Sequence, residues 1–105
     1  MQRGEVWWAV MNQPAGERPV VLLSRDEAYI ARSLVIVAPV TTRVRNIPAE
    51  VPLTKEDGMP QECVANLDVI TTIPKDSLRS RIAVLSAGKL KKVDEAIHFA
   101  LGLEK

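Results

Sequence analysis

The sequence predicts a mainly β fold of the α+β class, a small and strongly bent β-sheet or barrel with one long helix at its C-terminal end. Three observations predict it. Short apolar runs rich in β-branched residues recur along the chain, turn residues separate these runs, and a long apolar pattern of helical period begins only after Ser86. A chain of 105 residues suits one hydrophobic core and is too short for two, so we expect residues 1–105 to form a single domain.

The first half of the chain alternates between apolar runs and turn signals. The opening run is rich in aromatic and β-branched residues, which favour strands, and the segment after it contains Asn12, Pro14 and Gly16, which favour a loop. Pro39 lies inside the third run, and a proline within a strand indicates an edge position or a bulge. The expected order is a strand at 4–10, a loop at 11–17, a strand at 19–24, a short helix or turn at 25–32 and a strand at 34–41.

The second half is divided into shorter segments. Asp57-Gly58 and Pro60 indicate one turn, and Pro74 indicates the start of a helical turn. The expected order is a basic connection at 43–48, a strand at 50–53, a turn at 54–60, a strand within 62–70 that breaks near Leu67-Asp68 and could resume as a sixth, a helical turn at 74–80 and a last strand at 81–85.

The final segment has the features of an amphipathic helix. Ser86 is a favourable N-cap, and Gly102 is well placed to end the helix. Charged residues occupy the positions opposite an apolar stripe, so we expect the helix to lie on the sheet and cover its open side. The stripe consists of Leu90, Val93, Ile97, Ala100 and Leu101.

Composition excludes several classes of function. Apolar residues are 47% and the formal net charge is +1, so no global basic field indicates nucleic acid and any RNA site must depend on a local patch. Cys63 is the only cysteine and His98 the only histidine, which excludes an internal disulfide, a zinc ligand set and a two-histidine mechanism. We expect Cys63 to be buried in a strand. The N-terminus lacks a secretory signal and no apolar stretch is long enough for a membrane helix, so we expect a cytoplasmic protein.

Arg18 and Thr41 stand at the ends of the two most apolar runs. Arg18 carries a permanent positive charge and Thr41 a neutral hydroxyl. If their strands are neighbours, the two side chains could face one phosphate together. The alternatives are an Arg18 paired at the surface with Glu17 or Asp26, and a Thr41 that is only a favourable strand residue. Thr42, the adjacent hydroxyl, would point to the opposite face.

Other polar and aromatic residues are further candidates. Arg43 and Arg45 lie two positions apart and could contact backbone phosphates, or could belong to a solvated turn. Trp7 and Trp8 would occupy opposite faces of their strand; one would be in the core, and the other could stack on a base or pack at a dimer interface. Weaker basic candidates are Lys55, Arg79 and Arg81.

Five segments in order resemble the MazF/PemK toxins of type II toxin–antitoxin systems, and the resemblance covers essentially the whole chain. The segments are Arg3-Gly4-Glu5-Val6-Trp7, Arg18-Pro19-Val20-Val21-Leu22, Val37-Ala38-Pro39-Val40-Thr41, Asn66-Leu67-Asp68 to Thr72-Ile73, and Leu85-Ser86 to Leu101-Gly102-Leu103.

The resemblance implies an SH3-like β-barrel that works as a homodimer, without a cofactor or metal. The implied activity is sequence-specific cleavage of single-stranded RNA to 2′,3′-cyclic phosphate and 5′-hydroxyl ends, which inhibits translation and growth and is blocked by a MazE-like antitoxin. In this family an Arg of the Arg-Pro motif and a Ser or Thr ending the third strand are catalytic, which implies Arg18 and Thr41. The candidate RNA contacts are Glu17, Thr42, Arg43, Arg45 and Asp68.

The chemistry of RNA cleavage suits this pair. Attack of a 2′-hydroxyl on phosphorus builds negative charge on the non-bridging oxygens, and a guanidinium can grip two of them. Thr41 can donate a hydrogen bond to the same phosphate or orient the attacking hydroxyl. Because the pKa of an arginine side chain lies above about 12, we favour charge stabilisation by Arg18, with Arg18 or water as the proton donor, over Arg18 as general base.

The sequence departs from the family at three places, and two other functions remain open. The loop at 11–17 is short, Val69 stands where many relatives have Gln, and Gly88-Lys89 at the helix start weakens the match to the helix dipole. One alternative is a CcdB-like toxin that binds DNA gyrase, although such chains lack the Arg/Thr pair. The other is a barrel that only binds RNA or protein and would tolerate Arg18→Ala.

Overall fold

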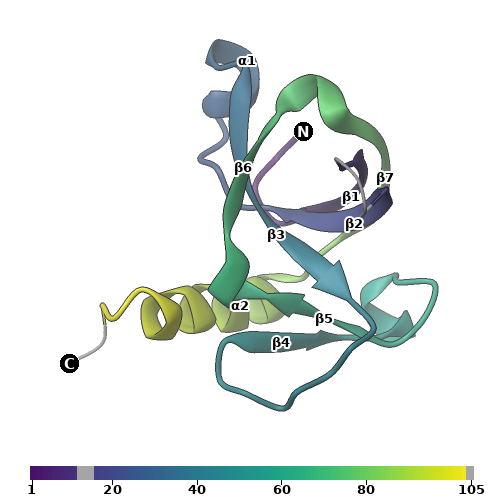
Figure 1. Cartoon of the computed structure of the whole chain (residues 1–105), viewed down its shortest axis with the longest axis vertical. Helices are drawn as coiled ribbons and strands as arrows, with labels where there is room; N and C mark the ends of the chain where they lie inside the picture. The colour runs from purple at the N-terminus through teal and green to yellow at the C-terminus, as the bar shows by residue number, and fades with distance from the viewer. Residues whose placement is uncertain (12–15, 104–105) are drawn as a thin grey trace.

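The computed structural model describes residues 1–11 and 16–103, and within them seven strands form one curved antiparallel sheet (Figure 1). The strands are β1 (Glu5–Val10), β2 (Glu17–Leu22), β3 (Leu34–Thr41), β4 (Glu50–Leu53), β5 (Cys63–Asn66), β6 (Thr71–Pro74) and β7 (Leu78–Val84). The helices are α1 (Ala28–Ala31) and α2 (Ala87–Ala100), with 3₁₀ turns η1 (Lys55–Asp57), η2 (Leu67–Val69) and η3 (Lys75–Ser77).

The central strand of this sheet is β3. The strand order is β4-β5-β3-β2-β1-β7, and β6 also pairs with β3. On the edge of β3 away from β2, β6 pairs with the first half of the strand, as far as Val37, and β5 pairs with the end of it from Val40 onward. The chain thus curls round β3, and the strand ends near Thr41 are drawn together.

Pro39 lies where the partner of β3 changes. The sequence predicted an edge strand or a bulge at Pro39; β3 is not an edge strand, because it has neighbours on both sides. The backbone of Ile36 bonds toward β2, accepting from Leu23 N and donating to Ser24 Oγ. Successive residues of a strand direct their backbone N–H and C=O groups to opposite edges, so the backbone of Pro39 faces the edge of β3 away from β2. On that edge Pro39 lies between Val37, the last residue paired with β6, and Val40, the first paired with β5. The missing N–H therefore interrupts no ladder.

The strands after β5 differ from the sequence prediction. The break near Leu67-Asp68 is confirmed as η2, but the sixth strand follows it at Thr71–Pro74 instead of lying within 62–70. The helical turn is only η3, and β7 begins at Leu78 instead of at 81. Pairing explains the early start, because Leu78 of β7 faces Ala9 of β1 across a register irregularity.

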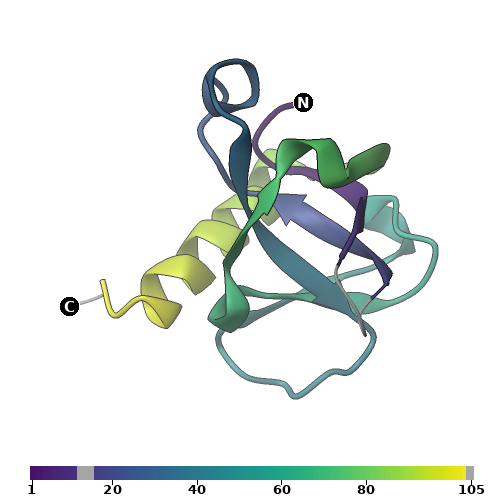
Figure 2. The ribbon, with the colours of Figure 1, turned by 45° about the horizontal axis from the view of Figure 1, so that its top comes forward.

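α2 lies against one side of the curved sheet in both views (Figures 1 and 2) and contacts β4 and η2. Ser86 caps it by accepting the Lys89 N–H at 3.1 Å, and Gly102, with φ of 70°, ends it. Val93 and Ala96 are buried, whereas Leu101, expected in the apolar stripe, is exposed because it is the C-cap. Within the described residues no helix is long and apolar enough to cross a membrane.

Two clusters of buried side chains form the core on the two faces of the sheet. One, containing Val21, Val40 and Cys63, lies under α2 and confirms that Cys63 is buried in a strand. The other contains Val20 and Val37. β2 and β3 contribute to both clusters because alternate residues point to opposite faces.

Candidate active site

Arg18 and Thr41 come together at the ends of β2 and β3. Val20 pairs with Pro39, and the same antiparallel register, continued by two residues, brings Arg18 opposite Thr41. By strand alternation Arg18 shares a face with Val20, and Thr41 shares a face with Val37. Both side chains are half-buried, and both line the same two cavities. The structure therefore brings the predicted cation and hydroxyl to one place.

The tryptophan cavity has a volume of about 270 Å³, and its wall combines polar and apolar side chains. Its described lining residues are Trp8, Glu17, Arg18, Pro19, Val40, Thr41, Thr42, Met59, Pro60, Gln61 and Cys63. Trp8 lines it, while Trp7 packs against the second core cluster and donates from Nε1 to Glu5 Oε1 at 2.8 Å. A flat aromatic wall beside an arginine can take a nucleic acid base, so Trp8 is the tryptophan that could stack.

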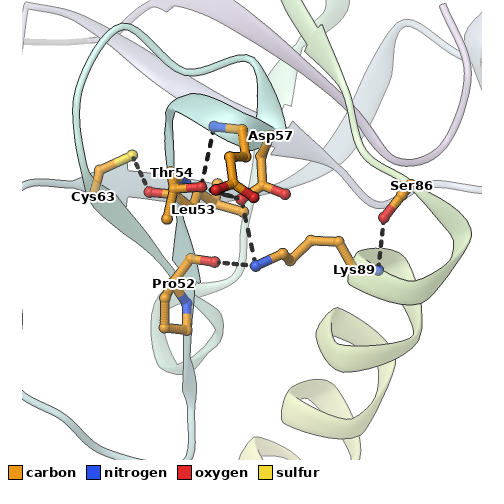
Figure 3. Close-up of polar contacts among 8 residues, drawn as sticks. Pro52, Leu53, Thr54, Asp57, Cys63, Ser86 and Lys89 are labelled. Carbon is orange, nitrogen blue, oxygen red and sulfur yellow. Dashed lines mark hydrogen bonds and ion pairs between the residues drawn. The ribbon is translucent and has the colours of Figure 1, made fainter.

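A fixed loop between β4 and β5 supplies one wall of the tryptophan cavity, namely Met59, Pro60 and Gln61. Asp57 Oδ2 accepts the Thr54 N–H at 2.8 Å and lies 3.4 Å from Lys89 Nζ (Figure 3). Lys89 Nζ also donates to the Pro52 carbonyl at 2.8 Å. The departure at Lys89 thus has a structural use, because this side chain joins the start of α2 to the cavity wall.

Electrostatics and backbone geometry reinforce that anchor. Burial on its own would raise the pKa of Asp57, but the hydrogen bonds from Thr54 and the charge of Lys89 outweigh it and hold the pKa below its usual value. Gly58 has φ of 96°, and a Cβ there would lie 2.9 Å from the Ala83 Cβ. A side chain at position 58 would therefore push the loop away from β7.

The arginine cavity has a volume of about 370 Å³ and lies on the other face of the strand ends. Its described lining residues are Arg18, Pro39, Thr41, Arg43, Arg45, Asn66 and Val69. Buried Glu50 holds the basic connection, since its Oε1 accepts the N–H groups of Arg45 at 2.9 Å and Asn46 at 3.1 Å. The structure thus confirms a local basic patch in a protein of net charge +1.

The hydroxyl of Thr41 is oriented by the same connection. Thr41 Oγ1 accepts the Arg43 N–H at 3.2 Å. A hydroxyl has one donor and two acceptor positions, so this contact occupies an acceptor position and leaves the O–H to donate. The Thr41 O–H is therefore available to donate to a ligand in the cavities that Arg18 also lines.

Residues 2–101 match the family described as the PemK-like, MazF-like toxin of type II toxin–antitoxin systems. The chain belongs to this family. It is 36% identical over 103 residues to the probable endoribonuclease MazF2 of Mycobacterium tuberculosis, covering 97% of this chain and 99% of that protein.

Solved structures agree with the family assignment. The Mycobacterium tuberculosis toxin MazF-mt6 superposes with a TM-score of 0.88 at 33% identity, covering 96% of this chain and 99% of that one. An endoribonuclease in complex with its cognate antitoxin, from a mycobacterial species, superposes with a TM-score of 0.87 at 26% identity, covering 100% of this chain and 98% of that one. The curved sheet with a C-terminal helix is the MazF fold that the sequence predicted.

The residues predicted for a MazF/PemK site divide between the two cavities. Glu17 and Thr42 line the tryptophan cavity, and Arg43 and Arg45 line the arginine cavity. Asp68 is exposed and is absent from the described lining of both; its backbone N–H donates to Asn66 Oδ1 at 3.0 Å. Sequence reasoning missed Asn66, although the polar Asn66-Leu67-Asp68 break after an apolar strand marked the place.

The weaker basic candidates lie outside the described linings of both cavities. Arg79 Nη1 donates to the Asp76 carbonyl at 2.8 Å, and Arg81 lies 3.5 Å from Glu5. Lys55 belongs to η1. The short first loop falls partly at residues 12–15, outside the described part of the chain. Within the described residues, no three His, Cys, Asp or Glu side chains gather as metal ligands would.

Proposed function

We propose that this chain is the toxin of a type II toxin–antitoxin pair and cleaves single-stranded RNA without a metal ion. The observation that carries the proposal is that Arg18 and Thr41 line the same two cavities. The name of the relative MazF2, a probable endoribonuclease, supports it. Cleavage of messenger RNA would inhibit translation and growth.

The cleavage mechanism uses the substrate's own 2′-hydroxyl. Its oxygen attacks the adjacent phosphorus, the bond from phosphorus to the 5′-oxygen breaks, and the products carry a 2′,3′-cyclic phosphate and a 5′-hydroxyl. Arg18 stabilises the charge that develops on the non-bridging oxygens, and the Thr41 O–H donates to the same phosphate. Water accepts the proton of the 2′-hydroxyl, and Arg18 or a second water supplies one to the departing 5′-oxygen.

The position of the pair suggests how RNA is held. Arg18 and Thr41 stand where the two cavities meet, so the scissile phosphate lies between a nucleotide in the tryptophan cavity and one in the arginine cavity. Arg43 and Arg45 then contact neighbouring phosphates. Trp8 stacks on a base on the other side.

The partners follow from the same family membership. A solved relative is in complex with its cognate antitoxin, and we propose a MazE-like antitoxin for this chain in the cytoplasm. We also propose a homodimer, supported by the exposed apolar side chains of Ile30, Leu34 and Ile36 on α1 and β3. A strict monomer in light scattering at micromolar concentration would contradict the dimer.

The test is RNA cleavage by the purified chain in EDTA. We expect cuts at a short sequence in a long single-stranded RNA, with cyclic phosphate and 5′-hydroxyl ends. Arg18→Ala should abolish cleavage without changing the melting temperature, and Arg79→Ala, outside both cavities, should leave it unchanged. Cleavage that needs magnesium, or inhibition of gyrase without RNA cleavage, would overturn the proposal.

A further inference from the structure

Asn66 presents an amide to the arginine cavity in a fixed orientation. Asn66 is the last residue of β5, is only 8% exposed, and pairs in register with Glu50 of β4. Its Oδ1 accepts the Asp68 N–H at 3.0 Å and so caps η2. With the oxygen held by the backbone, the Nδ2 group is the end of the amide left for another partner.

That Nδ2 group has no acceptor among the described residues. The fully buried side-chain atoms without a partner in the described part of the chain are Tyr29 Oη and Glu50 Oε2. Nδ2 of Asn66 is not one of these, so its N–H groups keep access to the cavity that Asn66 lines. A ligand that fills the cavity displaces water from this donor, so a ligand that offers it an oxygen or nitrogen acceptor is favoured over one that leaves it unpaired.

The rest of the lining indicates which part of a nucleotide Asn66 meets. Three arginines, Arg18, Arg43 and Arg45, supply charge suited to phosphate. Asn66 is a neutral donor beside Val69, an apolar side chain, and no carboxylate belongs to the described lining. A neutral donor beside an apolar surface suits the edge of a base better than a phosphate oxygen.

We propose that Asn66 is a specificity-determining residue that reads the base of the nucleotide in the arginine cavity. Its amide donates to a carbonyl oxygen, O4 of uracil or O6 of guanine. Cytosine and adenine carry an amino group at that position and would set donor against donor, leaving both unpaired. This inference rests on the proposed RNA substrate and deepens it.

Two variants separate base reading from a structural role. Asn66→Asp keeps an oxygen to cap η2 but presents an acceptor, so it should favour cytosine and adenine. Asn66→Ser keeps a capping hydroxyl and is too short to reach the base, so it should lose the preference. Glu62→Gln is the matched control, because Glu62 is an exposed residue just before β5 and lies outside the described lining of both cavities.

The experiment selects RNA by binding and not by cleavage. A randomised oligonucleotide pool with 2′-O-methyl groups, which cannot be cleaved, is bound to each full-length protein and the bound fraction is sequenced. For the wild type and Glu62→Gln we expect uracil and guanine to exceed cytosine and adenine roughly tenfold at one position, as one hydrogen bond would give. The preference should fall to within about twofold for Asn66→Ser and reverse for Asn66→Asp.

Three results would overturn the inference. These are a wild type without a preference at any position, an Asn66→Ser profile unchanged at every position, and an equal loss of binding to all sequences, which would place the amide on the RNA backbone. A parallel digestion of unmodified RNA separates this failure from that of the proposed function. If the RNA is cleaved but its base preference does not depend on Asn66, only this inference is overturned. If uracil and guanine are preferred but no RNA is cleaved, only the proposed nuclease activity is overturned.

Discussion

The two cavities beside Arg18 and Thr41 differ in both chemistry and construction. The tryptophan cavity has Trp8 in its mixed polar and apolar wall, and the loop that completes this wall is tied to α2 through Asp57 and Lys89. The arginine cavity has a basic wall, whose connection is tied to the sheet through the single carboxylate of Glu50. Under the proposed function, the pair Arg18 and Thr41 would serve two different sides, one that holds a base by stacking and one that holds the RNA backbone by charge.

Substitution of Trp8 should have the largest effect on RNA affinity and should act through the tryptophan cavity alone. Trp8→Leu keeps apolar bulk but removes the aromatic face, and stacking is worth about 1–3 kcal/mol per base. We expect the affinity for a non-cleavable RNA to fall roughly tenfold or more, with a normal salt dependence. Trp8→Phe should retain most of the affinity, measured by fluorescence anisotropy. Equal losses in the two variants would mean that the wall fills space and does not stack.

Substitution of Arg43 or Arg45, unlike substitution of Trp8, should change the salt dependence of RNA binding. Replacing either by Ala should weaken binding several-fold for all sequences, and should reduce the slope of log K against log salt by about 0.7 for each single-strand phosphate that the variant no longer neutralises. Titrations between low and moderate salt measure this slope. Lys55→Ala is the matched control, since Lys55 is an exposed basic residue in η1 outside both described linings. An unchanged slope for both arginine variants would remove the charge-based half of the comparison.

The Asp57 anchor should have a modest effect, seen in stability. Because the folded state holds the pKa of Asp57 below its usual value of 3.8, its stabilisation is present above that pH and is lost as the pH falls through the folded pKa. Asp57→Asn should lower the free energy of unfolding by roughly 1 kcal/mol at neutral pH, and the difference from wild type should shrink near pH 3.

Urea unfolding at the two pH values measures this difference. Lys89→Met should resemble Asp57→Asn, whereas Lys91→Met, on the same helix but exposed, should not. A difference that persists at low pH would show that Asp57 acts through packing and not through its charge.

Sequence reasoning recovered the elements whose pattern is local. The apolar run that follows Arg18, the apolar run that ends at Thr41 and the capped helix after Ser86 each carry their own periodicity or cap. β6 was not predicted in its place, because the strand Thr71–Pro74 is defined by its pairing with β3. Local patterns contain no information about such a distant partner.

The same distinction applies to the site. Arg18 and Thr41 could be predicted to lie together because Arg18 stands at the start of one apolar run and Thr41 at the end of the next, and two such positions need only one antiparallel register to meet. Gln61 and Asn66 enter the cavities only through the curl of β4 and β5 around β3, so their positions depend on contacts made far along the chain. Asp68 was preferred by resemblance, but the turn η2 leaves it exposed and places Asn66 in the lining instead.

A double-mutant cycle on the cleavage rate is the sharpest test of whether Arg18 and Thr41 act on one phosphate. Single-turnover rates in EDTA are measured for the wild type, Arg18→Lys, Thr41→Val and the double variant, with unfolding curves as a control for folding. If both groups contact the same phosphate, the effect of each substitution depends on the other residue. The fold-loss of cleavage rate in the double variant should then be about tenfold smaller than the product of the two single fold-losses. Losses that multiply, or a Thr41→Val variant with the wild-type rate, would contradict the shared site.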